Sequence, residues 1–130
     1  MKTQIVVDKS SRKIICTAFS AGKCHDFRLF KESKTRIDPE TQVQTDTGFI
    51  GITKIHANSE LPKKKSKKKP LSKNDRVENK RIASERATNE HAIGFLKRFK
   101  ILSERYRNRR KRFGLRFNLL DGICNFDFSA

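Results

Sequence analysis

The sequence feature that most constrains the fold is a lysine run between two prolines. Six of the seven residues 63–69 are lysine, and Pro62 and Pro70 flank the run. Because so many like charges cannot be buried together, residues 58–74 are expected to form a solvated loop that interrupts the fold. The run has two interpretations. It is either a loop without a binding role, which keeps the protein soluble or resembles a localisation tract, or it is a segment that contacts phosphate groups.

The charge of the whole chain favours phosphate contact. The 130 residues contain 31 Lys and Arg against 14 Asp and Glu, a net charge of +17. A folded chain of this charge repels itself, so we expect a polyanionic partner: nucleic acid first, an anionic membrane surface second. No apolar run approaches the roughly 20 residues that span a bilayer. The amino terminus turns polar too early for a secretory signal, which predicts a cytoplasmic location.

Cysteine and histidine spacing argues against a zinc site. The cysteines are odd in number and contain no Cys-x-x-Cys pair, which fits a reducing compartment. The histidines are scattered, and each is expected to be a surface or helix-capping residue rather than a ligand. The residues concerned are Cys16, Cys24, Cys124, His25, His56 and His91.

The amino-terminal part predicts a β-hairpin followed by a short helix. Residues 5–7 and 14–18 are β-rich runs, and the polar residues between them predict an antiparallel turn. Asp8 ends the first run, where it is either a turn residue or a nuclease carboxylate; the adjacent turn favours the former. Asp26 is expected to cap a helix that buries Phe27 and Phe30.

Asp46 is the first candidate site residue. Residues 41–46 predict a strand that ends in this carboxylate, and Gly48 and Gly51 then predict a turn into a short helix. A carboxylate at the carboxyl end of a strand points into the crevice where α/β sheets place their sites. An ordinary turn residue is the alternative interpretation.

A long helix over residues 73–100 carries the second candidate, Glu90. Ser72 and Asp75 have the spacing of a capping box at its start. Helical geometry places Arg86, Glu90 and Lys97 within about 40° of one another, at the edge of the apolar side. A carboxylate between two cations stays ionised and suits a metal ligand in phosphoryl transfer. Acid–base pairs at this spacing also commonly cover a solvated helix face.

The carboxyl-terminal part combines arginines with an apolar helix. Residues 105–112 form a second basic cluster, and arginine forks match phosphate oxygens. A helix over residues 109–126 is expected to bury one apolar side. The residues of that side are Phe113, Phe117, Leu120, Ile123, Cys124 and Phe126.

Four blocks in order resemble a known family. Residues 22–27 are similar to a Gly-x-x-His-Asp block, and residues 45–51 to an Asp-Ser-Gly-Tyr-x-Gly block. Residues 86–97 reproduce the signature Arg-x3-Glu-x6-Lys, and residues 105–119 are similar to a basic carboxyl-terminal tail. Over nearly its whole length the chain therefore resembles the C-terminal part of a DDE transposase of bacterial insertion sequences, which has a ribonuclease-H-like catalytic domain.

The resemblance implies an α/β fold, an incomplete ribonuclease-H-like domain over residues 1–130 with a basic loop at 58–74 and a basic cluster at 105–112. It implies that Asp46 and Glu90 are catalytic and bind divalent metal, Mg²⁺ in particular, which is used to cut DNA and join the freed 3′-hydroxyl to target DNA. Further residues are expected to support the site or contact DNA phosphates. They are Arg86, Lys97, Lys63, Lys64, Lys65, Arg105, Arg107, Arg109 and Arg110.

The sequence departs from the family in three places. Phe49 and Ala83 stand where tyrosine is usual. The first catalytic aspartate of the family lies upstream of the segment that matches residues 2–8, so Asp8 does not replace it. We therefore expect the chain to be inactive alone and to need an upstream fragment that supplies this aspartate. Intact relatives are expected to form oligomers. The expected location is the bacterial cytoplasm, in association with the nucleoid. The alternative is a small basic nucleic-acid-binding protein without catalysis.

Overall fold

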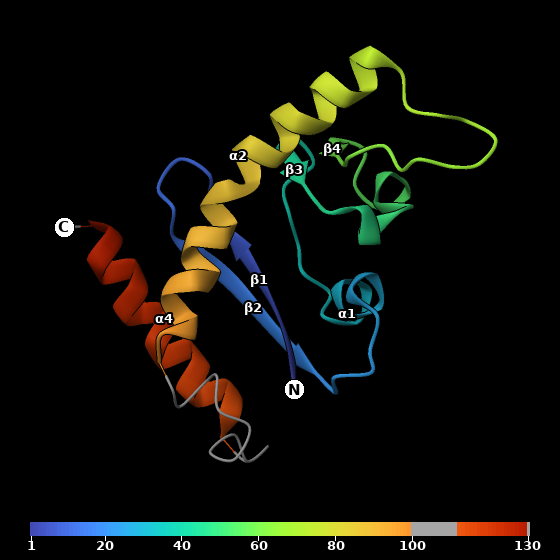
Figure 1. Cartoon of the computed structure of the whole chain (residues 1–130). Coiled ribbons are helices and arrows are strands. Elements are labelled where there is room, and N and C mark those ends of the chain that lie inside the picture. The colour runs from blue at the N-terminus through green and yellow to red at the C-terminus, as the bar shows by residue number, and fades with distance from the viewer. Residues whose placement is uncertain (100–111, 130) are drawn as a thin grey trace. The chain divides into compact units, whose positions relative to one another are not determined.

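The computed structural model describes residues 1–99 and 112–129 (Figure 1). The chain divides into two compact units. The first unit contains Met1–Cys24 and Ala87–Ala130, and the second contains His25–Arg86. Helix α2 (Lys73–Lys97) contributes residues to both. The mixture of a hairpin, short strands and helices confirms the predicted α/β class and is consistent with a partial ribonuclease-H-like fold. The two units are described separately below.

The predicted amino-terminal hairpin is confirmed in the first unit. Strands β1 (Lys2–Val7) and β2 (Ile14–Ser20) pair antiparallel, with an irregularity at the Val6/Val7 step. Asp8 holds the turn, because its carboxylate accepts hydrogen bonds from both side-chain hydroxyls and from one backbone N–H of the two turn serines. Those bonds, the one from the Ser11 hydroxyl above all, lower the pKa of Asp8 to about 2. The turn role predicted for Asp8 is therefore confirmed.

Helix α4 (Phe113–Ser129) supplies most of the core of the first unit. It packs with hairpin residues from both β1 and β2 and with the carboxyl-terminal half of α2, and the ring of Phe19 in β2 meets two α4 rings edge-on. The buried core residues are Ile14, Ala92, Leu96, Phe113, Phe117, Leu120 and Cys124. The prediction was wrong for Ile123 and Phe126, whose exposed fractions are 44% and 76%. They lie outside the arc of α4 that the core spacing defines.

Two asparagines join α4 to the edge of β2. The side-chain amide of Asn125 donates to the carbonyl of Ile14 (2.9 Å) and accepts from its backbone N–H (2.7 Å). Asn118 accepts a hydrogen bond from the hydroxyl of Thr17 at 2.7 Å. The N–H and carbonyl of Ile14, which pair with no other strand among the described residues, are thereby satisfied.

The second unit begins with helix α1 (Asp26–Glu32). Its N-cap is His25, whose ring nitrogen accepts from the N–H of Phe27, so the capping role expected for His25 is confirmed, whereas the prediction that Asp26 is the cap was one residue late. Asp26 instead occupies the first turn, where its negative charge interacts favourably with the helix dipole. The buried pair is Leu29 and Phe30, while Phe27 is only half-buried.

Short elements follow α1 in the second unit. Strands β3 (Val43–Gln44) and β4 (Ser59–Glu60) pair in parallel, and the 3₁₀ helices η1 (Thr47–Phe49) and η2 (Ile52–Lys54) lie between them. The predicted strand at 41–46 is therefore shorter, and β4 falls inside residues 58–74, which were expected to form only a loop. His56 was expected to be a surface or helix-capping residue, but it is buried and its ring nitrogen lies 2.6 Å from the carbonyl of Thr41.

Helix α2 begins as the sequence predicts. The hydroxyl of Ser72 accepts from the N–H of Asp75 (3.1 Å), and the Asp75 carboxylate accepts from the N–H of Ser72 (3.2 Å). This reciprocal pair is the capping box. The described part of the chain contains no helix long and apolar enough to cross a membrane. None of the three cysteines, all of them described, is in a disulfide.

Candidate functional site

Asp46 lies where the chain leaves β3 and enters η1. Its backbone is extended, and its Oδ1 accepts hydrogen bonds from the N–H (2.6 Å) and the hydroxyl (3.3 Å) of Thr47. The side chain is 59% exposed, and Oδ2 has no hydrogen-bond partner among the described residues. Asp46 thus caps a 3₁₀ helix through one oxygen and presents the other to solvent.

Arg86 is the cation beside this carboxylate. Its guanidinium lies 3.7 Å from Oδ1 of Asp46, and its side chain is only 25% exposed. An ion pair of this length on a half-exposed carboxylate adds little stability, so its main effect is on orientation. Arg86 was expected to orient Glu90 or to hold DNA; the structure places it against Asp46, and it precedes Glu90 by one turn of α2.

A polar network fixes α2 on the β3–β4 pair near Asp46. Arg81 donates to Glu60 of β4 (2.8 Å) and to two carboxylates of its own helix, Glu78 and Glu85. Gln44 of β3 donates to both Glu60 (3.0 Å) and Glu85. The carboxylates, with Glu78 first, raise the pKa of Arg81, and the bond from Arg81 lowers the pKa of Glu78. This network was not predicted from the sequence, although Glu78, Arg81 and Glu85 have helical ion-pair spacing.

The His-Asp block and the Asp46 block meet within the second unit. A β-carbon on Gly48 would lie 4.0 Å from Oδ2 of Asp26, and one on Gly51 would lie 3.6 Å from the ring of Phe27. Gly51 also has φ of +97°, a left-handed conformation that favours glycine. The ring of Phe49, where tyrosine is usual, packs edge-on against Phe27 at 6.2 Å. These blocks are therefore neighbours in space as well as in sequence order.

Glu90 and Lys97 lie in the part of α2 that belongs to the first unit. Both are exposed, so neither lies at the edge of the buried face as expected, and neither has an ion pair or hydrogen bond with a described residue. The buried apolar residues of α2 are Ile82, Ala92 and Leu96. Because Asp46 belongs to the other unit, the shared metal site of Asp46 and Glu90 stays a prediction. Within residues 1–99 and 112–129, no group of three or more His, Cys, Asp or Glu is arranged to hold a metal.

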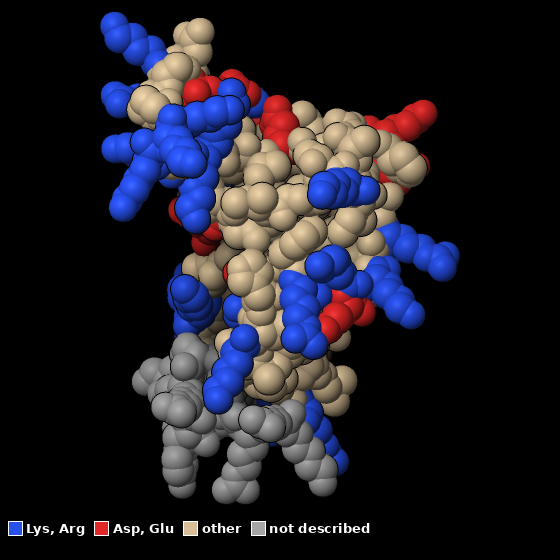
Figure 2. Space-filling model, turned by 90° about the vertical axis from the view of Figure 1, so that its right-hand side faces the viewer, with Lys and Arg blue, Asp and Glu red and all other residues tan. Residues whose placement is uncertain are grey.

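The basic candidates differ in their surroundings. Lys63 forms an ion pair with Asp75 at 2.5 Å, whereas Lys64 and Lys65 are exposed. In the side view, Lys and Arg side chains gather most densely in the upper part of the face, the height at which the lysine loop lies (Figure 2). The arginines expected to contact phosphate in the second cluster lie outside the described residues. They are Arg105, Arg107, Arg109 and Arg110.

Comparison with known proteins identifies the family. Residues 1–125 match the model of the DDE superfamily endonuclease family. The chain is 45% identical over 129 residues to a protein of Microchaete diplosiphon described as a probable transposase for insertion sequence element IS702. The match covers 99% of this chain and 47% of that protein, so the chain spans about half the length of its curated relative. No solved structure matches. The family match extends over nearly every residue and confirms the resemblance found in the sequence, so the chain belongs to the DDE superfamily endonucleases.

Proposed function

We propose that this chain is part of a transposase catalytic domain, in which Asp46 and Glu90 bind one divalent cation for cleavage and joining of DNA phosphodiester bonds. The observation that carries the proposal is the position of Arg86. It lies 3.7 Å from Asp46 and one helical turn before Glu90, so one guanidinium would serve both carboxylates. The family match and the positive charge of the chain add to this support.

The donor atoms of the two carboxylates fit a hard cation. Magnesium prefers carboxylate oxygens and keeps several waters, so exposed side chains suit it. Oδ2 of Asp46 and the carboxylate of Glu90 are both without described partners. When bound, the cation would polarise the phosphate and stabilise charge on the attacking and leaving oxygens. Arg86 would keep Oδ1 of Asp46 oriented, while Lys97, Lys64 and Lys65 would neutralise DNA phosphates.

Two carboxylates are fewer than the family uses, so residues 1–130 would not cut DNA by themselves. The third carboxylate would come from outside these residues, in the same polypeptide or in a separate upstream fragment. The alternative function is DNA binding without catalysis. The observation that favours it is the net charge of +17 over 130 residues, which suits a polyanionic partner without requiring a metal site.

A nicking assay tests the proposal. The chain, with and without a segment that carries the first aspartate of the family, is incubated with supercoiled DNA and Mg²⁺ or Mn²⁺. We expect cleavage only in the mixture and only with metal, and its loss in Asp46→Asn and Glu90→Gln. Glu32→Gln is the matched control, because it removes an exposed carboxylate whose ion pair within the described residues is with Arg28 at 2.7 Å.

Cleavage that survives Glu90→Gln, or that persists in EDTA, would rule out the metal assignment. Binding of DNA with no cleavage in any mixture would favour the non-catalytic alternative. Manganese binding measured by calorimetry gives a second readout, because Asp46→Asn should weaken it while Glu32→Gln leaves it unchanged.

A further inference from the structure

The base of the lysine loop is fixed to helix α2. The backbone N–H of Lys63 donates to Oδ1 of Asn79, and the amide of Asn79 donates back to the carbonyl of Lys63, both at 2.9 Å. Asn79 lies near the start of α2 and is half-buried. A paired donor and acceptor on one side chain hold both the position and the direction of the loop where it leaves the fold.

The Lys63 side chain is also engaged at this point. Its ammonium lies 2.5 Å from the Asp75 carboxylate, which also closes the capping box of α2 with Ser72. The bond between them raises the pKa of Lys63 and lowers the pKa of Asp75. The Lys63 side chain is 70% exposed, so this ion pair is weak by itself. It nevertheless directs the ammonium toward the helix and compensates its charge.

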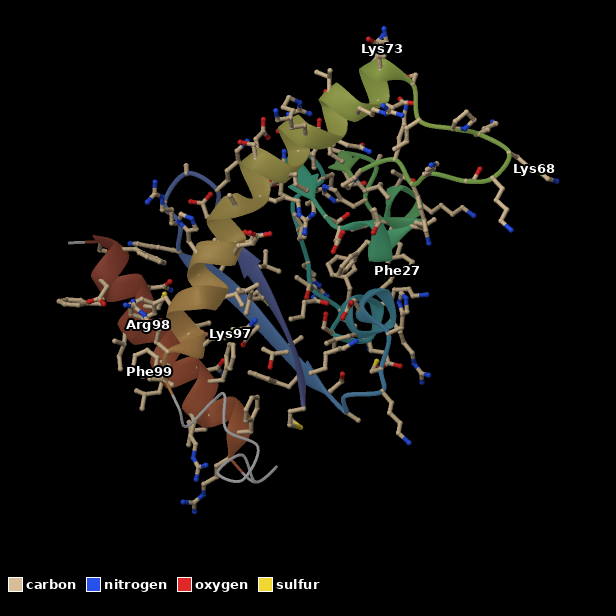
Figure 3. All side chains as sticks on the ribbon, in the orientation of Figure 1. Phe27, Lys68, Lys73, Lys97, Arg98 and Phe99 are labelled. Carbon is tan, nitrogen blue, oxygen red and sulfur yellow. The ribbon has the colours of Figure 1, made fainter. Side chains whose placement is uncertain are left out.

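The outer part of the loop has a turn of its own. The N–H of Lys69 donates to the hydroxyl of Ser66 at 3.0 Å, and the N–H of Ser66 donates to the carbonyl of Lys69 at 3.3 Å. Lys68 lies at the outer bend (Figure 3). The remaining lysines have exposed side chains with no described acidic partner. They are Lys64, Lys65, Lys67, Lys68 and Lys69.

We propose that the lysine loop is a preorganised contact for the phosphate backbone of duplex DNA, with its five outer lysines as phosphate ligands and Lys63 as a positioning residue that binds Asp75. This rests on the proposed function for the identity of the partner. The proposal gives Lys63 a different role from the one predicted from the sequence, which was contact with DNA phosphates. Asn79 and Lys63 orient the loop, and the outer lysines supply the charge.

Duplex DNA fits this loop better than a membrane does. Fixing a loop in advance lowers the entropic cost of binding, and the fixed lysine positions match a partner best when its charges also have fixed positions. Phosphates of a duplex are fixed along two strands, whereas lipid head groups move laterally. The exposed residues 63–69 also contain no apolar side chain, and peripheral membrane segments usually insert one.

Salt-dependent binding tests the division of roles. Affinity of the whole chain for a labelled duplex is measured by fluorescence anisotropy from about 50 to 200 mM salt. Lys68→Ala should lower the slope of log K against log salt by about 0.9, the value for one phosphate contact. Lys63→Ala removes the same charge but should change the slope by less than half as much. Equal slope changes in the two variants would overturn the assignment of Lys63.

Asn79→Ala tests the fixed base of the loop without changing charge. We expect the affinity to fall about three- to tenfold, because ordering the loop then adds to the cost of binding. Asn74→Ala is the matched control, an exposed asparagine of α2 with no hydrogen bond to a described side chain, and should bind like the wild type. Circular dichroism checks that each variant is folded. If Asn79→Ala is not folded, the comparison of the salt slopes of Lys63→Ala and Lys68→Ala still tests the proposal.

Three further outcomes would overturn the proposal. The first is an affinity of Asn79→Ala for the duplex equal to that of Asn74→Ala. The second is an unchanged slope of log K against log salt after replacement of all five outer lysines. The third is loop-dependent binding to phosphatidylserine vesicles that is tighter than binding to the duplex. If the variant that lacks all five outer lysines keeps the wild-type slope but still supports metal-dependent nicking, the proposed function stands and only the role of the loop is refuted. Absence of any duplex binding by the wild type would count against both.

Discussion

Replacement of Asp121 by asparagine should make the protein more stable at neutral pH. Asp121 lies on the buried side of α4 with 5% of its surface exposed. Neither carboxylate oxygen has a hydrogen-bond partner within the described residues. Burial raises its pKa from 3.8 to about 6. The folded protein therefore holds the proton more tightly than the unfolded chain does, and ionisation of Asp121 opposes folding.

The sign and size of the effect follow from linkage. Between pH 4 and pH 6 the folded state binds more protons at Asp121, so stability falls as the pH rises through this range. A shift of about two pKa units corresponds to about 3 kcal/mol at 1.36 kcal/mol per unit, taken as an upper limit. An asparagine side chain cannot ionise, so Asp121→Asn should match the wild type near pH 4 and exceed its unfolding free energy by about 2–3 kcal/mol at pH 7.5.

Urea unfolding followed by circular dichroism at several pH values measures this difference. Cys124, one turn further on α4, does not interfere, because burial and then the negative charge of Asp121 raise the pKa of its thiol. Asp127→Asn is the control, since Asp127 is exposed on the same helix. Parallel pH profiles for the wild type and Asp121→Asn, or a variant that is less stable at pH 7.5, would refute the reasoning.

Three other substitutions test the packing and the backbone. Phe117→Ala should cost about 3–5 kcal/mol in urea unfolding, because it leaves a cavity in the core, whereas Leu115→Ala on the exposed side of α4 should stay within about 0.5 kcal/mol. Gly51→Ala should lower the unfolding free energy by about 1–3 kcal/mol, because alanine is strained at the positive φ of this position. Gly22→Ala should be nearly neutral, because a β-carbon there would face open space. An equal loss of stability in the two variants would contradict this. Asn125→Ala should cost about 1–3 kcal/mol, and hydrogen exchange should show faster exchange of the β2 amide that it bonds.

The sequence predicted the features that depend on neighbouring residues. The hairpin, the capping box of α2 and the turn at Asp8 each need only a short stretch of suitable side chains. The order of the family blocks was equally visible.

Features that depend on pairing between distant segments were not predicted. Strand β4 has two residues, too few for a β pattern, and it exists because it pairs with β3. Arg86 was expected to orient Glu90 or to hold DNA phosphates, but the register of α2 on the strands places it against Asp46. That register depends on Arg81 and Gln44, whose partners lie up to 41 positions away along the chain. No local pattern contains this information.

The amide of Asn125 has a consequence for the solubility of the hairpin. It carries the same donor and acceptor as a peptide bond, and at Ile14 it takes the place of one residue of a third strand. A foreign strand that approaches this rung must first displace it, so the side chain guards the open flank of the hairpin against intermolecular pairing. An isosteric leucine at this position would fill the same space and remove that protection.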